Sequence, residues 1–195
     1  GPASIPVVVT WSARDAVAGL SDATVSVKCG EGQVQRSEAP GSAAPDELVD
    51  WRAEAAVFPD SICSVTAIGK DGAGNSTRRT VKGVVARVVA TSDDTLASDD
   101  TVASAVVQGD QVGVIARRGP SGGRAAITLD GNVVGEIDLW APDSGGAEVV
   151  FVLDLEPGVS HQLRVEATGT SDPASTGSAI AIDGFVTLSL ASSAA

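Results

Sequence analysis

Apolar and polar residues alternate over many short segments of this chain, a pattern that predicts strands with one buried and one exposed face. Segment 23–29 is the clearest example, because Val25, Val27 and Cys29 share one face and polar residues separate them. Segment 30–45 is polar and rich in Gly, Ser and Pro, which predicts a long surface loop. The predicted strands occupy residues 5–15, 23–29, 61–70, 76–81, 84–91, 101–107, 111–117, 124–129, 133–140, 147–155, 161–167 and 179–190.

Segment 49–58 is ambiguous between helix and strand. Leu48, Trp51 and Phe58 fall on a rough helical stripe, whereas an apolar residue occupies every second position from Val49 to Val57. The period of two favours a strand.

The composition agrees with these strands. Valine is abundant, Tyr and Met are absent, and 22 Gly and 9 Pro supply turns. A length of 195 residues fits two domains of roughly 100 residues each. The sequence therefore predicts an all-β protein of two β-sandwich domains in tandem, over residues 1–84 and 85–195.

The charge of the chain limits its partners. The net charge is −12, and residues 86–195 carry 5 Lys/Arg against 15 Asp/Glu. Such an acidic half repels phosphate backbones, so nucleic acid and anionic membranes are poor partners. No apolar run approaches the ~18 residues of a membrane span, and no membrane insertion is expected.

Both cysteines, Cys29 and Cys63, lie in the first half. There is no CxxC motif and no neighbouring histidine, so a disulfide across a sandwich is favoured over a metal site. A disulfide implies an oxidising compartment, which predicts a secreted or cell-surface protein.

The hairpin at 130–132 follows from matching faces. Ala125, Ile127 and Leu129 form the apolar face of the incoming strand, and the best apolar set of the outgoing strand is Val133, Ile137 and Leu139. Cross-strand partners share a face, so odd-numbered residues must pair with odd-numbered ones. This predicts a three-residue loop, Asp130 to Asn132, with a left-handed residue at Gly131 or Asn132.

The same assignment places Trp140, Asp138 and Glu136 together on the polar face. An indole beside two carboxylates is suited to a sugar, because the indole stacks on the ring and carboxylates accept from hydroxyls. The alternative is that Trp140 covers the end of the core. No catalytic residue, metal ligand or cofactor is expected.

Arg117, Arg118 and Arg124 surround the Gly/Pro loop 119–123. They could form an anion site for acidic sugars, since Arg matches carboxylate geometry. The favoured alternative is that they neutralise an acidic surface through weak exposed pairs. His161, the only histidine, is expected to bond a neighbouring backbone group or carboxylate.

Two acidic stretches raise the question of calcium. Residues 93–100 contain four aspartates, and Asp71 lies in a Gly-rich turn. A calcium site needs six to eight oxygens, so a solvated acidic loop and a turn aspartate are the favoured interpretations.

The first half resembles a bacterial immunoglobulin-like domain over about residues 5–82. The resemblance rests on the opening segments TWSARD and AGLSDATV and on a D-x-A-G-N-S turn. The turn residues are Asp71, Ala73, Gly74, Asn75 and Ser76. Such domains usually act as spacers.

The second half, about residues 88–190, resembles a jelly-roll module of secreted bacterial proteins, similar to galactose-binding-like and carbohydrate-binding modules. The motif residues are Gly119, Pro120, Gly123, Ala125, Asp130, Gly131, Gly135, Asp138, His161, Leu163, Gly169, Pro173, Gly177, Asp183 and Phe185. The resemblance implies a glycan or cell-wall polysaccharide as ligand.

Together these features predict a non-catalytic accessory region of a secreted or cell-surface bacterial protein. An immunoglobulin-like spacer would precede a module that binds glycan weakly, and other domains of the parent protein would be partners. The alternative is a purely structural stalk or assembly module without a small ligand.

Overall fold

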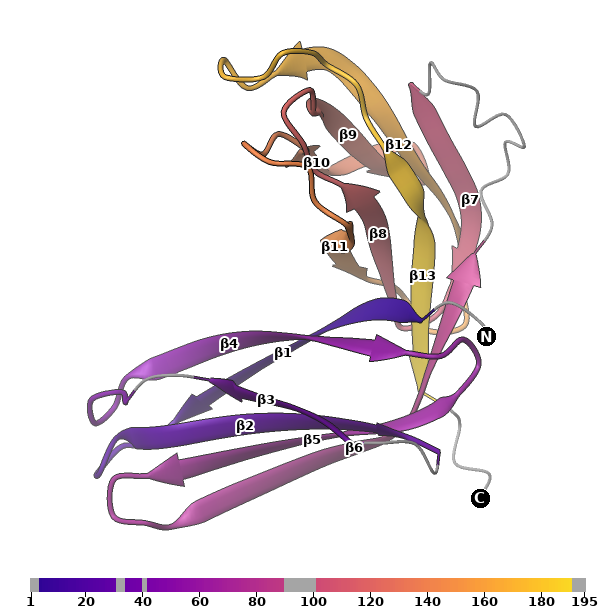
Figure 1. Cartoon of the computed structure of the whole chain (residues 1–195). Helices are drawn as coiled ribbons and strands as arrows, with labels where there is room; N and C mark the ends of the chain where they lie inside the picture. The colour runs from indigo at the N-terminus through magenta and orange to yellow at the C-terminus, as the bar shows by residue number, and fades with distance from the viewer. Residues whose placement is uncertain (1–3, 31–33, 40–41, 90–100, 191–195) are drawn as a thin grey trace. The chain divides into compact units, whose positions relative to one another are not determined.

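A computed structural model describes residues 4–30, 34–39, 42–89 and 101–190 (Figure 1). These residues contain no helix, and therefore none that could cross a lipid bilayer. The all-β prediction is confirmed.

The chain divides into two compact units, one formed by the chain up to Ala86 and the other by Arg87–Ser189. The strands are β1 (Ile5–Arg14), β2 (Leu20–Cys29), β3 (Gln35–Ala39), β4 (Leu48–Val57), β5 (Ile62–Asp71), β6 (Ser76–Val89), β7 (Val102–Gln108), β8 (Gln111–Arg117), β9 (Gly123–Leu129), β10 (Asn132–Asp138), β11 (Ala147–Asp154), β12 (Ser160–Ser171) and β13 (Ile182–Leu190).

The first unit consists of two facing sheets of unequal size. One sheet is the antiparallel pair β1–β4, and in the other the strands follow the order β6-β5-β2-β3 (Figure 1). Every second residue points inward, as the alternation predicts, and the strand prediction for 49–58 is confirmed by β4. The buried side chains of these strands are Ile5, Val7, Leu20, Ala23, Thr24, Val25, Val27, Ala53, Ala55, Val57, Cys63 and Ala86.

The disulfide between Cys29 and Cys63 is present, but it does not cross the sandwich. The two cysteines are direct register partners on β2 and β5, with their Cα atoms 4.0 Å apart. Alternation shows only which face a cysteine occupies, and here both strands belong to one sheet. The placement across the sandwich was therefore wrong.

The long surface loop predicted over 30–45 is also corrected. Residues Gln35–Ala39 form β3, an edge strand that pairs with β2. Its polar sequence reflects exposure at the edge of the sheet, where charged and polar residues are common.

The second unit pairs its strands in nested fashion. β9 pairs with β10, β8 with β11 and β7 with β12, all antiparallel. The nested pairs fold into two facing sheets, β10-β9-β12-β7 and β11-β8-β13. Phe185, Ile127 and Leu139 are among the fully buried side chains between the two layers. The consecutive strands predicted over 147–155 and 161–167 do not pair with each other, because β11 and β12 belong to different sheets.

The β9–β10 hairpin turns through two residues rather than the predicted three. Asn132 pairs with Leu129, which leaves Asp130 and Gly131 as the loop. Both residues have positive φ, 51° and 81°, as a type I′ turn requires. The expected left-handed residue at Gly131 is present, and the expected loop length was wrong.

A bulge in β10 puts Ile137 and Leu139 on the buried face, which the three-residue loop was expected to do. The register shifts between Val133 and Gly135, so that Ile137 pairs with Ala125. Ile137 and Leu139 are accordingly buried, at 5% and 0% exposure, whereas Val133, before the bulge, is 72% exposed. The extra residue lies in the strand instead of the loop.

Candidate functional site

The structure brings three of the predicted ligand residues together at the end of β10. The guanidinium of Arg124 donates from Nε to Asp138 Oδ2 over 3.0 Å, and the Trp140 backbone N–H donates to Asp138 Oδ1 over 2.9 Å. The indole of Trp140 is half-buried, and Glu136 is exposed two residues before Asp138. We call Trp140, Asp138, Arg124 and Glu136 the Trp140 surface.

The Asp138 carboxylate and the Arg124 guanidinium of this surface stabilise each other's charged forms. The Trp140 N–H, followed by Arg124, keeps the pKa of the Asp138 carboxyl below its usual value. Asp138 in turn raises the pKa of the Arg124 guanidinium. Both groups are therefore ionised at neutral pH, and the pair fixes the start of the turn that carries the indole.

The other two predicted arginines lie in separate ion pairs. Arg117 donates to both oxygens of Asp183 on β13, from Nε over 3.1 Å and from Nη2 over 2.8 Å. Arg118 lies 2.9 Å from Glu148 on β11. The side chains of all four residues are partly exposed. The geometry agrees with arginines that neutralise an acidic surface, and the three do not converge on one anion.

The Gly/Pro loop 119–123 is a packing feature. A Cβ on Gly122 would lie 1.9 Å from the Leu139 carbonyl oxygen, and one on Gly123 would lie 2.2 Å from that of Ser178. The hydroxyl of Ser175 lies 2.9 Å from the Gly122 carbonyl and so joins loop 172–177 to it. Glycine is required here because two backbones approach closely.

His161 meets a carboxylate, as predicted. Its Nδ1 lies 2.7 Å from Asp130 Oδ2 in the hairpin turn, and the Gln162 N–H donates to Asp130 Oδ1 over 2.8 Å. The hydrogen bond from His161, followed by that from Gln162, lowers the pKa of Asp130. This pair anchors the turn to β12.

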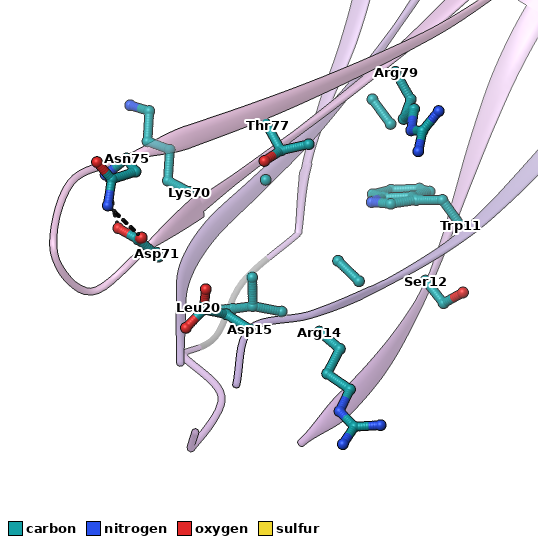
Figure 2. A pocket seen from close by; sticks show the side chains of 13 residues that line it. Trp11, Ser12, Arg14, Asp15, Leu20, Lys70, Asp71, Asn75, Thr77 and Arg79 are labelled. Carbon is teal, nitrogen blue, oxygen red and sulfur yellow. Dashed lines mark hydrogen bonds between the residues drawn. The ribbon is translucent and has the colours of Figure 1, made fainter. Parts of the chain in front are cut away.

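A cleft that the sequence did not predict lies in the first unit. It encloses about 310 Å³ between β1 and the strands β5 and β6 (Figure 2). Trp11 lines it from β1, and Ala67 and Gly69 of β5 line it beside their register partners on β6, Arg79 and Thr77. We call these five residues the Trp11 cleft.

The sequence contains only part of the information that predicts this cleft. Trp11 has the same parity on β1 as the buried Ile5 and Val7, and Arg79 pairs with Ala67, which pairs with the buried Val25. Parity therefore turns both side chains inward. That they line an open space depends on how many strands each sheet contains, which alternation does not reveal.

No group of three or more potential metal ligands occurs among the described residues. The carboxylate of Asp71 is used within its own turn, where it accepts the Asn75 N–H and the Asn75 side-chain amide, each over 2.7 Å. These bonds, the side-chain bond first, lower the pKa of Asp71. The acidic stretch 93–100 lies outside the described residues.

Comparison with protein-family models and with curated proteins finds no match to the chain. The two family resemblances therefore rest on the sequence motifs alone.

Proposed function

We propose that the chain is a non-catalytic accessory region of a secreted or cell-surface bacterial protein. An immunoglobulin-like spacer precedes a jelly-roll module that binds glycan weakly at the Trp140 surface. The other domains of the parent protein supply any catalysis.

The strand pairing of the second unit supports a jelly roll. A jelly roll arises when a long antiparallel hairpin wraps into two sheets, and the nested pairs 9–10, 8–11 and 7–12 have this arrangement. The motif glycine Gly123 fits the same interpretation, because it and the adjacent Gly122 permit close contact between loops.

Two features of the first unit support a secreted spacer. The disulfide is typical of an oxidising compartment. The D-x-A-G-N-S turn connects β5 to β6, and Asp71 holds it by bonds to Asn75. A small sandwich closed in this way suits a rigid spacer.

The Trp140 surface carries the glycan proposal. Its indole is half-buried on a backbone that the bond to Asp138 holds, and partial burial limits its rotamers, so stacking on a sugar costs little side-chain entropy. Glu136 is exposed on the same strand face and offers acceptors to hydroxyls. The polar groups that hold the indole are already paired, which is consistent with weak binding.

Polysaccharide pull-down and glycan-array binding test the proposal. We expect Trp140→Ala to abolish retention on any glycan that binds the native chain. The matched control is Val133→Ala, because Val133 is an exposed apolar residue of the same hairpin. Retention that survives Trp140→Ala would refute the site.

A structural stalk without a ligand is the second candidate. It is favoured by one observation: Arg117, Arg118 and Arg124 are each paired with a carboxylate of the same unit. Absence of binding to every glycan tested, with the fold intact, would support the stalk.

A further inference from the structure

The Trp11 cleft exists because two strands face four in the first unit. The sheet β1–β4 lies against the sheet β6-β5-β2-β3, and among the described residues no strand pairs with the other edge of β1. The inward-facing side of β6 is therefore left open. Its residues Thr77, Arg79 and Val81 are exposed, although they lie on the face of the sheet that is turned toward the core.

The open side presents an aromatic face and a cation to the same space. Figure 2 shows the indole of Trp11 on β1 and the guanidinium of Arg79 on β6 turned toward the same cleft, which Thr77 also lines, two residues before Arg79 on β6. Gly69, the register partner of Thr77, also lines the cleft, and a Cβ there would meet only Leu20 Cδ2, at 4.0 Å. The cleft is thus accessible down to the backbone of β5.

The cation is available, whereas the neighbouring carboxylates are not. None of the described carboxylates forms an ion pair with Arg79. Asp15 lines the same cleft, but its Oδ1 accepts the N–H groups of the turn that follows β1, at 3.0, 2.6 and 3.1 Å. Asp71 is bonded to Asn75. In a chain of net charge −12, Arg79 is therefore a cation that an anionic ligand can reach.

We propose that the Trp11 cleft binds a carboxylate-bearing sugar ring, of the uronic-acid class. The indole of Trp11 stacks on the C–H face of the ring, Arg79 binds the carboxylate through its planar fork, and the hydroxyl of Thr77 bonds a ring hydroxyl. This site lies in the first unit and is independent of the Trp140 surface.

The size and polarity of the cleft favour a saccharide over an added polypeptide strand. A volume of about 310 Å³ lies at the lower end of the range for small-ligand sites, roughly 300–1,000 Å³. A strand packed on β6 would bury the charge of Arg79, which is costly unless the strand supplies a carboxylate, whereas an acidic sugar supplies one.

NMR titration of the full chain with trigalacturonate tests the proposal, with neutral galactotriose as the uncharged comparison. The three tryptophan indole N–H signals are assigned from single Trp→Phe variants. We expect trigalacturonate to shift the Trp11 signal saturably, with an affinity at least tenfold above that of galactotriose. Raising the salt concentration should weaken binding, because the carboxylate contact is exposed.

Three variants separate the contacts. Arg79→Ala should weaken binding about tenfold, because it removes a charge-assisted contact. Arg78→Ala is the matched control, because it removes the same charge from the opposite face of β6 and should change affinity less than twofold. Gly69→Val should abolish binding by filling the cleft while leaving the fold intact.

Several results would overturn the proposal. They are the absence of a saturable shift of the Trp11 signal, equal losses for Arg79→Ala and Arg78→Ala, and full binding by folded Gly69→Val. A trigalacturonate shift confined to Trp140 would overturn it too, and would support the jelly-roll site instead.

Discussion

The two units differ in how well their sheets cover each other. In the second unit four strands face three, and Phe185, Ile127 and Leu139 are fully buried between them. In the first unit two strands face four, and the inward-facing Trp11 stays half-buried beside a cleft. The two layers of the second unit bury its inward-facing side chains, whereas the unequal sheets of the first unit leave the inward-facing Thr77 and Arg79 exposed.

Removing a large buried ring from the matched unit should have the greatest effect on stability. We expect Phe185→Ala to lower the free energy of unfolding by about 3–5 kcal/mol, because it leaves a cavity between two complete layers. Urea unfolding measures the change. Phe58→Ala, at a side chain that is 54% exposed, should cost less than about 1 kcal/mol. Equal costs would contradict the difference in burial.

Opening the disulfide should weaken only the first unit. The bond closes a loop with a sequence separation of 34 residues. In the chain-entropy treatment, its loss costs roughly 3–4 kcal/mol. We expect the double variant Cys29→Ser/Cys63→Ser to unfold at lower urea concentration, with unchanged amide NMR signals from residues 101–190. Loss of the signals from both units at the same urea concentration would show that they do not unfold separately.

Most strands could be predicted, because alternation over a few residues is a local property. Even the ambiguous segment 49–58 was resolved by its period of two. The errors concern properties that depend on neighbours. The polar strand β3 is ordered by pairing with β2, and the disulfide joins one sheet because β2 and β5 are adjacent. The β9–β10 turn has two residues instead of the predicted three, because the extra residue forms a bulge within β10 that parity alone cannot locate.

The candidate sites show the same division. The sequence placed Trp140, Asp138 and Glu136 on one face by parity, whereas the bond from Arg124 to Asp138 emerges only from the register of β9 and β10. The Trp11 cleft was missed because Trp11 and Arg79 are distant in sequence and meet only through the order of strands in two sheets. Local pattern reveals which way a side chain points, and topology decides whether another strand covers it.

The loop contacts of the second unit should have an intermediate effect. The Ser175 hydroxyl lies 2.9 Å from the Gly122 carbonyl and 2.8 Å from that of Gly177. Removing it leaves partly buried carbonyls with fewer donors, so Ser175→Ala should cost about 1–2 kcal/mol in thermal or urea unfolding. The exposed neighbour Ser178 is the control. An equal effect of Ser178→Ala would show that the contact is not specific.

Acid should weaken the Asp130 anchor by a smaller amount. The bond from His161 lowers the pKa of Asp130 in the folded chain. Its stabilising effect is therefore complete above the unfolded carboxyl pKa, about 3.9, and is lost as the pH falls through the folded value. We expect Asp130→Asn to flatten the fall in Tm of the second unit between pH 5 and pH 2, and Asp143→Asn to leave it unchanged. An unchanged slope in Asp130→Asn would exclude the anchor.

The claim that the sheets cover each other less completely in the first unit than in the second is tested most directly by a Gly→Ala substitution in each unit. A Cβ on Gly69 would lie 4.0 Å from Leu20 Cδ2, whereas one on Gly135 would lie 2.5 Å from the ring of Phe151. The free energies of unfolding of Gly69→Ala and Gly135→Ala should therefore change in opposite directions. We predict a gain of about 0.5–1 kcal/mol for Gly69→Ala, as expected for alanine in an open strand position. We predict a loss of about 1–3 kcal/mol for Gly135→Ala, from overpacking. A loss in both variants would contradict the open cleft in the first unit.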